Sequence, residues 1–543
     1  MKIGIAQINT KLGDIQFNES KIIDTISTLG NQVDLIVFPE MTITGYPLND
    51  LLDDVDLVKT QKQSIYRIQE TIKTQFPSLK VVVGFIDYNE QESLPSGMMK
   101  KFNAAAVIGA DIQIYHKHLL PNYDVFFEQR YFAPGTEGLI FDVNGTRCGV
   151  TICEDIWDDD YAVKPINHYK NQNIDLVINI SSSPFTNHKL TKRLSLLERH
   201  NKDIKSAFLY VNQVGGQDEL VFDGGSMVMN KAGELVYFGK SFEEEITIID
   251  FDGSQQDVKH TVADRDAQTN EQYLQAIQLG TFDYLRKTGI KDVVIGVSGG
   301  VDSALNLYIL SQIIAPEHIH AIYMPSKHNA DESFQLAEQL CKNVGVELNV
   351  GPIQDLVTSF QTFGKTYLGK EPTGVTYENI QARLRGMILM NIANDVGGMV
   401  INNTNKTELD LGYGTLYGDL IGGLGLIGDL NKREVYALSE YCNQRAGYDV
   451  IPSRIITRKA SAELADNQVD PFDYDRVSDA VEELGFGASI DLIPQKYNLP
   501  KEEVQGYKRR INRNEFKKQT APLVLKLKHR SIGVGRLIPI VQG

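Results

Sequence analysis

The first half of the chain alternates short apolar runs with polar segments, and this pattern predicts many strands separated by fewer helices. Short apolar runs bounded by turn residues are typical of strands, whereas apolar residues at helical spacing predict amphipathic helices. The runs that predict strands are 2–8, 34–40, 80–86, 102–109, 148–153, 174–181, 207–213 and 225–230. The segments that predict helices are 17–30, 56–76 and 188–205. This mixture indicates a layered α/β domain.

A polar stretch, 252–268, interrupts this pattern. Its sequence, DGSQQDVKHTVADRDAQ, contains few large apolar residues and is typical of a linker. Beyond it, strands and helices alternate more regularly, as they do in a doubly wound parallel sheet. We therefore expect an N-terminal domain over 1–252, a linker over 253–270 and a C-terminal domain over 271–543.

The clearest local motif of the C-terminal domain is SGGVDS, at 298–303. It follows an apolar run, 292–297, that predicts a buried strand, and it precedes an apolar pattern, 304–314, that predicts a helix. A strand, a glycine-containing turn and a helix together point backbone N–H groups and a helix N-terminus at an anion. The motif therefore predicts a cradle for pyrophosphate.

The residue types within this loop suit a bound nucleotide. Gly299 and Gly300 allow the backbone to approach a ligand closely. Ser298 and Ser303 add hydroxyl donors, and Asp302 can hold Mg²⁺, which neutralises charge on a pyrophosphate leaving group. A Ser/Gly turn alone is commonly only a turn, but this one lies between a strand and a helix. It is not a Walker A loop, because no Gly-Lys-Ser/Thr follows.

Three separated segments of the first half each place a reactive residue close to an apolar strand. They are VFPEMTITGYP with Glu40, YHKHLLPNYDVFFEQRYF with Lys117, and GVTICEDIW with Cys153. A lysine favours a thiolate and can stabilise an oxyanion, and a carboxylate can take the thiol proton and later activate water. Together these groups suffice for acyl transfer from an amide. Singly, each has a plainer interpretation: a buried small hydrophobe for the cysteine and solvated side chains for the other two.

The three segments resemble the nitrilase, or carbon–nitrogen hydrolase, superfamily over about residues 1–250. The resemblance implies a four-layer αββα sandwich. It implies Glu40 as general base, Lys117 as oxyanion stabiliser and Cys153 as nucleophile. It also implies that Glu128 supports the position of the substrate.

The segment INISSSPFTNHK is similar to that of glutamine-hydrolysing members of this superfamily. The resemblance implies that Ser183, Lys189 and Tyr123 contact glutamine. From the residues alone, Ser183 is typical of a turn, Lys189 of a surface lysine at a helix start and Tyr123 of a packing aromatic.

The loop SGGVDS resembles the ATP-pyrophosphatase, or PP-loop, family, whose members cleave ATP between its α and β phosphates and adenylylate a carbonyl oxygen. Farther along, YENIQARLRGMI, INNTNKTELDLGYGTLYGD, DLNKREVYAL and SAELADNQVD are similar to segments of the NAD synthetases. The resemblance implies an ATP site formed by Gly296, Val297, Ser298, Gly299, Gly300, Val301, Asp302, Ser303, Asn403, Lys432 and Ser461. It implies a deamido-NAD site formed by Asn379, Arg383, Glu408 and Lys517, with Asp302 and Glu408 as ligands of Mg²⁺.

The sequence departs from the NAD synthetase pattern in two places. Asn403-Thr404 replaces the usual Thr-Gly, so a hydroxyl contact to ATP is missing there, although Asn403 can still donate a hydrogen bond. Ala460 replaces a usual proline. Neither change removes a group that performs the chemistry.

Composition narrows the possible partners. The formal net charge of −16 argues against a nucleic-acid partner held by overall phosphate attraction. The cysteines, Cys148, Cys153, Cys341 and Cys442, form no C-x-x-C pair, which favours a reducing, cytoplasmic location over a disulfide framework. Their spacing predicts Cys148 in the core, on the opposite strand face from Cys153. No apolar run is long enough to predict a membrane span.

Both halves together resemble the glutamine-dependent NAD synthetases, and the resemblance covers nearly the whole chain. It implies synthesis of NAD from deamido-NAD, ATP and glutamine, with release of AMP, pyrophosphate and glutamate and with passage of ammonia between two sites. It also implies a homo-oligomer. Two alternatives stay open: a PP-loop amidotransferase acting on another nucleotide, and a non-catalytic nitrilase half joined to a synthetase that uses free ammonia.

Overall fold

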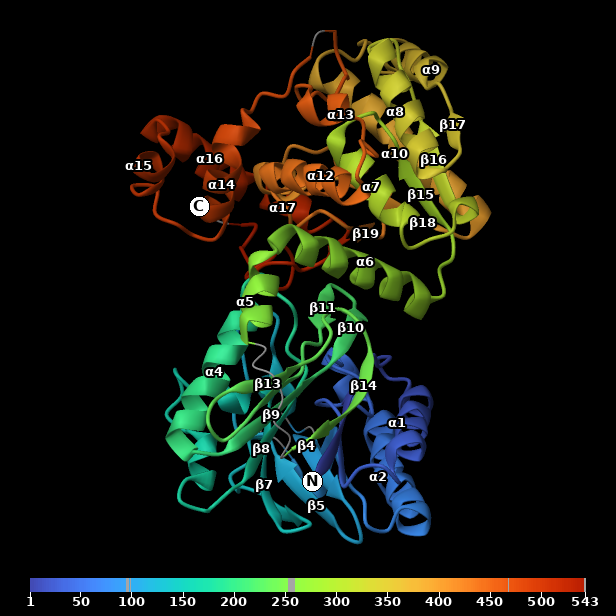
Figure 1. Ribbon diagram of the computed structural model, residues 1–543. Helices are drawn as coiled ribbons and strands as arrows, with labels where there is room; N and C mark the ends of the chain where they lie inside the picture. Colours follow the sequence, from blue (N-terminus) through green and yellow to red (C-terminus); the bar gives the residue numbers. More distant parts are fainter. Residues whose placement is uncertain (94–96, 98, 252–258, 467, 542–543) are drawn as a thin grey trace. The chain divides into compact units, whose positions relative to one another are not determined.

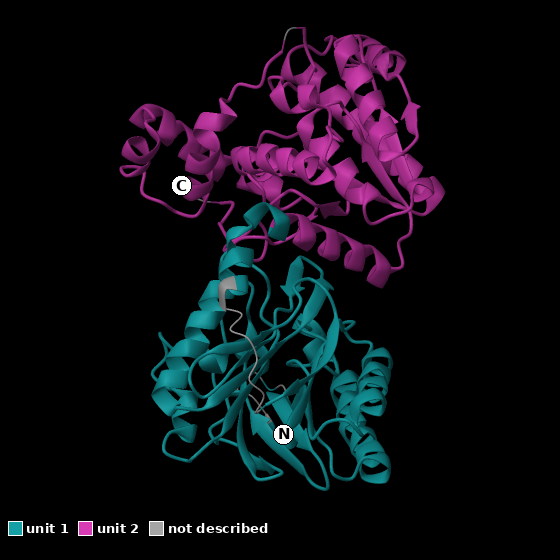
Figure 2. Cartoon of the chain, in the orientation of Figure 1, with its two compact units in different colours: residues 1–272 teal, residues 273–543 magenta. Residues whose placement is uncertain are grey.

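The computed structural model describes residues 1–93, 97, 99–251, 259–466 and 468–541 (Figure 1). The chain divides into two compact units, 1–272 and 273–543 (Figure 2). No helix among the described residues is long and apolar enough to cross a membrane.

The predicted linker, 253–270, and the domain boundaries that it sets stay predictions. Residues 252–258 lie outside the described residues. Residues Lys259–Ala267 form helix α5, and Val262 of this helix is fully buried in the core of the first unit.

Two six-stranded sheets and a separate hairpin form the first unit. In spatial order, the first sheet contains β14 (Glu245–Asp250), β1 (Lys2–Gln7), β2 (Leu35–Val37), β3 (Lys80–Ser93), β4 (Met99–Ile108) and β5 (Ile112–His116). The second contains β13 (Leu235–Phe238), β12 (Met227–Met229), β9 (Ala207–Asn212), β8 (Leu176–Ser181), β7 (Thr146–Ile152) and β6 (Ile140–Val143). The hairpin consists of β10 (Val214–Gln217) and β11 (Leu220–Asp223).

Helices cover the outer face of each sheet, so the layers run α, β, β, α (Figure 1). The inner faces pack against one another through side chains such as Ile5 and Val150. The outer helices are α1 (Ile15–Leu29) and α2 (Val55–Gln75) on the first sheet, and α4 (Lys189–Ile204) and α5 on the second. Short helical turns are η1 (Asn49–Asp53), α3 (Glu128–Tyr131), η2 (Cys153–Ile156) and η3 (Pro165–Tyr169). The predicted αββα sandwich is confirmed.

The second unit is built on one six-stranded sheet in which every strand pair is parallel. Its spatial order is β17 (Leu348–Val350), β16 (Ile319–Tyr323), β15 (Val293–Gly296), β18 (Met399–Asn402), β19 (Leu424–Gly425) and β20 (Leu523–Val524). When the six strands are numbered by their order along the chain, they lie side by side in the order 3-2-1-4-5-6. This is the strand order of a doubly wound sheet. The predicted fold class is therefore confirmed for this unit too.

Helices flank this sheet. Val294, Ile322 and Val400 pack against α9 and α10, while α7 and α8 contact β15 and β16. The helices are α6 (Thr269–Thr288), α7 (Val301–Ser311), η4 (Pro316–His318), α8 (Asp331–Val344), α9 (Gln354–Tyr367), α10 (Val375–Val396), α11 (Lys406–Leu411), α12 (Lys432–Ala446), α13 (Ser453–Thr457), α14 (Tyr474–Gly485), α15 (Ile493–Tyr497), α16 (Lys501–Arg513) and α17 (Glu515–Lys518). The strand order reverses between β15 and β18, which is where doubly wound sheets bind ligands.

Candidate active sites

The predicted catalytic residues of the first unit all follow the ends of strands. Glu40 follows β2, Lys117 follows β5 and Cys153 follows β7. Lys117 Nζ lies 2.7 Å from Glu40 Oε1, and both side chains are buried. The charges on Glu40 and Lys117 both act on the pKa of the Cys153 thiol, so the three groups share one site. Residues far apart in the sequence are thus brought together.

A second carboxylate completes a buried network around Lys117. Glu128 Oε1 accepts hydrogen bonds from Lys117 Nζ (2.8 Å) and Tyr46 OH (2.9 Å). Asn103 Nδ2 bridges the carboxylates, at 2.7 Å from Glu40 Oε1 and 3.3 Å from Glu128 Oε2. Burial raises the pKa of Glu128 to about 7, with Lys117 opposing and Glu40 reinforcing the shift. Two carboxylates that are buried away from water therefore share one lysine as their ion-pair partner.

Cys153 begins a tight turn and does not continue the strand. Strand β7 ends at Ile152, and Cys153 has a φ of 41°, which is unusual for a residue with a side chain. Burial raises the pKa of its thiol, the Glu40 charge adds to the shift and the Lys117 charge opposes it. The lysine is therefore the group here that favours a thiolate.

Cys148 and Cys153 were expected to lie on opposite faces of one strand. This was wrong, because only Cys148 lies on the strand. The alternation of faces applies only within a strand, and the strand ends one residue before Cys153. Cys148 does lie in the core between the sheets, where it is fully buried.

An aspartate that the sequence analysis missed joins the cysteine turn to the segment after Lys117. Asp155 is fully buried, and its carboxylate accepts hydrogen bonds from the backbone N–H groups of Ile152 (2.9 Å), His118 (3.0 Å) and Leu119 (2.9 Å). This carboxylate holds the nucleophile and the lysine at a fixed separation. Its sequence signal was the acidic pair directly after Cys153.

The predicted glutamine contacts lie on two segments of the first unit. Ser183 is buried just after β8, and Lys189 begins α4, where its Nζ donates to Pro184 O at 2.9 Å. Tyr123 is 48% exposed, and its OH donates to Glu154 Oε1 at 2.9 Å. Burial raises the pKa of Glu154, and the Lys117 charge opposes the shift. Sequence reasoning missed Glu154, which directly follows the nucleophile.

Glu128→Gln tests the buried carboxylate pair through the pH dependence of stability. Because the folded-state pKa of about 7 lies above the ordinary value of 4.5, the folded protein binds more protons between these values. The contribution of Glu128 to the free energy of unfolding therefore falls as pH rises through this window. The Tm of the variant minus that of the wild type should rise across the window and level off above it.

Thermal unfolding at about pH 5 to 8 measures this difference. Glu70→Gln, at an exposed position of α2, is the matched control and should give a flat difference. A flat difference for the Glu128 variant would show that its carboxyl titrates normally, and a falling one that its folded-state pKa is lowered; either result would contradict the prediction.

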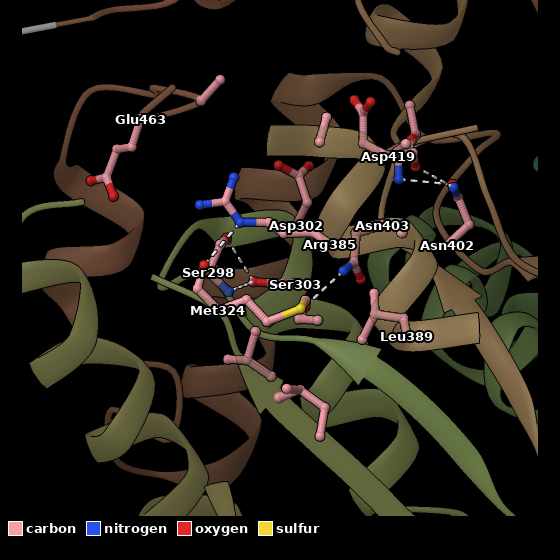
Figure 3. Close-up of a pocket in the computed structure, with 18 of the residues that line it drawn as sticks. Ser298, Asp302, Ser303, Met324, Arg385, Leu389, Asn402, Asn403, Asp419 and Glu463 are labelled. Atoms are coloured by element: carbon pink, nitrogen blue, oxygen red, sulfur yellow. Dashed lines mark hydrogen bonds between the residues drawn. The ribbon is translucent and has the colours of Figure 1, made fainter. Parts of the chain in front are cut away.

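In the second unit, the SGGVDS loop connects β15 to α7. Gly299 has a φ of 78°, and a Cβ on it would lie 2.4 Å from Ser333 O. Glycine is therefore required by both conformation and space. Ser303 Oγ accepts from the backbone N–H of Ser298 at 3.2 Å, and Gly300 N–H donates to Ser298 Oγ at 3.2 Å. These bonds close the loop at the start of the helix, and Figure 3 shows the contact between Ser298 and Ser303.

Two neighbouring cavities, of about 280 and 140 Å³, open beside this loop. They share several wall residues, including Ser298, Asp302 and Glu408. The predicted ATP residues that line one or both cavities are Gly296, Val297, Ser298, Gly300, Val301, Asp302, Ser303, Asn403, Lys432 and Ser461. Gly299 lines neither of the two, because it packs against Ser333.

Asn403, the departure from the family pattern, braces the wall of the larger cavity. Its Nδ2 donates to Gly296 O at 2.9 Å, and its Oδ1 accepts from Asn306 Nδ2 at 2.9 Å. The backbone N–H of Thr404 donates to Asn402 Oδ1 at 2.9 Å. The side chain at position 403 therefore ties β15, α7 and the end of β18 together, as Figure 3 shows for its contact with β15.

A buried lysine neutralises the acidic residues beside the loop. Lys432 Nζ pairs with Asp302 and lies 3.4 Å from Glu408 Oε1. Asp302 Oδ1 also accepts from Asn405 Nδ2 at 3.0 Å. Burial raises the pKa of Glu408 to about 8, with Lys432 opposing and the Asp302 charge adding to the shift. The two predicted metal ligands thus face one cation in this structure.

The remaining predicted deamido-NAD residues converge on one loop, 412–416, and line neither cavity. The contacts are Asn379 Oδ1 with Thr415 Oγ1 (2.8 Å), Arg383 Nε with Leu416 O (3.1 Å), and Lys517 Nζ with Gly412 O (2.8 Å) and Gly414 O (2.7 Å). Burial lowers the pKa of Lys517. These side chains hold the loop that follows α11.

A different arginine of α10, Arg385, reaches the larger cavity (Figure 3). Its Nε donates to Met324 O at 2.9 Å, and its Nη2 donates to Asn329 Oδ1 at 3.1 Å. Burial lowers its pKa to about 10. Arg383 of the same RLR triplet does not line this cavity and stays a predicted deamido-NAD contact. Sequence reasoning missed Arg385, because only the packing of α10 shows which arginine reaches the cavity.

Two family models match the chain in successive stretches. The carbon-nitrogen hydrolase model matches residues 2–259, and the NAD synthase model matches residues 273–521. The first match contains the Glu40, Lys117 and Cys153 site, and the second contains the SGGVDS loop with its cavities.

Curated relatives match the whole chain. The glutamine-dependent NAD(+) synthetase of Acinetobacter baylyi is 33% identical over 551 residues, covering 100% of this chain and 98% of the relative. The glutamine-dependent NAD(+) synthetase of Thermotoga maritima is 34% identical over 593 residues, again covering 100% and 98%.

Solved structures agree with these matches. A glutamine-dependent NAD+ synthetase from Acinetobacter baumannii, in complex with ADP, has a TM-score of 0.75 and 31% identity, covering 100% of this chain and 98% of that chain. A synthetase of the same description from Cytophaga hutchinsonii has a TM-score of 0.84 at 19% identity with the same coverage, which shows a shared fold. The chain belongs to the glutamine-dependent NAD(+) synthetase family.

Proposed function

We propose that the chain catalyses the ATP-dependent amidation of deamido-NAD to NAD with glutamine as nitrogen donor, releasing AMP, pyrophosphate and glutamate. One observation carries this proposal. A single chain holds a buried Glu40, Lys117 and Cys153 site in its carbon-nitrogen hydrolase part and a cavity of about 280 Å³ beside SGGVDS in its NAD synthase part.

The first half-reaction releases ammonia from glutamine. The Cys153 thiol gives its proton to Glu40, and its sulfur attacks the side-chain amide carbon. Lys117 stabilises the oxyanion that forms. Glu40 then gives the proton to the amide nitrogen, the C–N bond breaks, ammonia leaves, and a thioester remains. Water activated by Glu40 then hydrolyses the thioester to glutamate. The 2.7 Å contact between Lys117 and Glu40 supports this division of roles.

The second half-reaction activates the carboxylate of deamido-NAD. This carboxylate attacks the α-phosphorus of ATP, pyrophosphate leaves, and ammonia then displaces AMP from the mixed anhydride. Helix α7 begins directly after the glycines of the loop, and the backbone N–H groups of a helix N-terminus bind phosphate. Lys432 supplies a buried positive charge on the same side of the loop.

The residues around the loop fit Mg²⁺. No three acidic, histidine or cysteine side chains of the described part of the chain converge on one metal position. Mg²⁺ commonly takes only one or two carboxylates from the protein and completes its shell with phosphate oxygens and water. Asp302 and Glu408 are such a pair, and the ion would neutralise charge on the departing pyrophosphate.

The proposal is tested by following nitrogen from the glutamine side chain into product. With ATP, deamido-NAD and amide-labelled glutamine, the label should appear in the carboxamide of NAD, with one glutamate released per NAD. NAD formation from ammonia without glutamate release would support the alternative in which the first unit is a non-catalytic scaffold. Failure to turn over deamido-NAD with either nitrogen source would contradict the proposed substrate.

The homo-oligomeric assembly and the cytoplasmic location stay predictions of the sequence. So does passage of ammonia between the two sites. Ammonia attacks only as the free base, and a path that excludes bulk water would preserve that form.

A further inference from the structure

A buried arginine lies directly behind the residues that we expect to contact glutamine. Arg193 is fully buried in the first unit, and no step of the proposed reaction uses it. It lies four residues after Lys189 on α4, so both side chains project from the same face of this helix. A buried charge is costly unless it is paired and fully hydrogen-bonded, so its contacts are informative.

The guanidinium of Arg193 holds the turn that follows β8. Its Nη2 donates to Ser183 O at 2.8 Å and lies 3.4 Å from Ser183 Oγ and 3.5 Å from Pro184 O. Lys189 Nζ donates to the same Pro184 O at 2.9 Å. Two of the cationic side chains of α4, Lys189 and Arg193, therefore meet at the turn that contains Ser183.

A buried carboxylate of the hairpin anchors the arginine. Asp223, at the end of β11, is 1% exposed, and its Oδ2 accepts from Arg193 Nη1 at 2.8 Å. The end of β9 holds the turn from the other side, because Asn212 Oδ1 accepts from the Ser183 N–H at 2.8 Å. The turn is thus fixed to two separate elements through side-chain hydrogen bonds.

The same turn contacts the expected general base. The backbone N–H of Ser182 donates to Glu40 Oε2 at 2.7 Å, and Ser182 Oγ donates to Glu40 O at 3.0 Å. The hydrogen bonds of Arg193 to this turn go to Ser183 and Pro184, the two residues after Ser182. A shift at Arg193 would therefore act first on the glutamine-binding side of the turn.

We propose that Arg193 is a positioning residue that holds Ser183 and Pro184 in place for glutamine binding, and that Asp223 acts through Arg193. This inference rests on the proposed function, because it takes Ser183 and Lys189 as glutamine contacts. A planar guanidinium can bond the carboxylate and the turn carbonyl with separate nitrogens, whereas a lysine has a single nitrogen. Charge alone therefore does not replace the arginine.

Arg193→Lys is the main test. It keeps the positive charge facing Asp223 but removes the separate guanidinium nitrogens that bond Asp223 and the turn. Loss of a hydrogen bond from a charged group predicts a rise in KM for glutamine of about tenfold or more. The kcat for glutamate release should change much less, since the Ser182 contacts with Glu40 remain. Lys192→Gln, at the preceding exposed position of α4, is the matched control and should leave KM unchanged.

Asp223→Asn is the second variant, because it keeps the shape of the side chain while removing its charge. If Asp223 acts only through Arg193, the double variant should have nearly the KM of Arg193→Lys, not the product of the two single effects. Thermal unfolding, the rate of Cys153 alkylation and ammonia-supported NAD formation identify a variant that has misfolded. The alkylation rate and the ammonia-supported rate should match the wild type in each correctly folded variant.

An unchanged KM for glutamine in both single variants would overturn the inference. A fall in kcat at constant KM would also overturn it, because it would place Arg193 in the chemical step. These results differ from failure of the proposed function, in which the wild-type protein itself would release no glutamate from glutamine.

Discussion

Cys153→Ala is expected to abolish NAD formation from glutamine and to leave NAD formation from ammonia near the wild-type rate. The substitution removes the thiol on which the charges of Glu40 and Lys117 act, so no thioester can form. Removing a catalytic nucleophile lowers kcat by about a thousandfold or more, so the residual glutamine-dependent rate should be near background. The measurement is initial-rate NAD formation with each nitrogen source in turn.

Cys148→Ala is the matched control for this result. Cys148 is also fully buried in the first unit, but it lies in the core between the sheets. Its variant should keep glutamine-dependent synthesis and lose only some thermal stability. Loss of ammonia-supported synthesis in Cys153→Ala, with an unchanged unfolding transition, would contradict two separate sites.

Asp302→Asn is expected to have the opposite effect. NAD formation should fall by about a hundredfold or more with both nitrogen sources, because Asp302 is the loop carboxylate that faces Lys432 and the expected Mg²⁺. Glutamate release from glutamine should persist, because that chemistry belongs to the first unit. The measurements are ATP–pyrophosphate exchange with deamido-NAD, NAD formation and glutamate release on the same preparation.

Asp395→Asn, at an exposed position of α10, controls for removal of one aspartate from this unit. It should leave all three rates unchanged. Normal ATP–pyrophosphate exchange in Asp302→Asn would show that the loop carboxylate is not needed for adenylylation. Loss of glutamate release in the same variant would show that the two reactions depend on one another.

Hydrophobic periodicity located most of the elements that position the two sites. Expected strands 80–86 and 207–213 correspond to β3 and β9, and the expected helix 56–76 corresponds to α2. Their buried faces follow local patterns that a strand or helix imposes on its own residues. The short strands of the hairpin, β10 and β11, were missed because four-residue segments carry little periodic signal, and β10 also contains two glycines.

Contacts between distant segments could not be predicted from the sequence. The resemblance implied Asn379 and Arg383 as deamido-NAD contacts, which stay predictions, and the structure shows that their side chains bond to the loop 412–416 while Arg385 lines the larger cavity. Spacing predicts which residues share a helix face, but the packing of the helix against the rest of the unit decides what each face contacts.

The sequence by itself indicated the parallel-sheet fold of the second unit through its alternating strands and helices, and the resemblance to a known superfamily implied the αββα fold of the first. The sequence also predicted the SGGVDS cradle and the Glu40, Lys117 and Cys153 set, because each is recognised from a short motif whose residues are close together in the chain. Only the tertiary structure decided that Cys153 starts a strained turn, that Asp155 joins it to the lysine segment, and that Arg193 ties the serine turn to Asp223. Such contacts join residues tens of positions apart, and they exist only because two sheets close over one another and bury their polar groups in pairs.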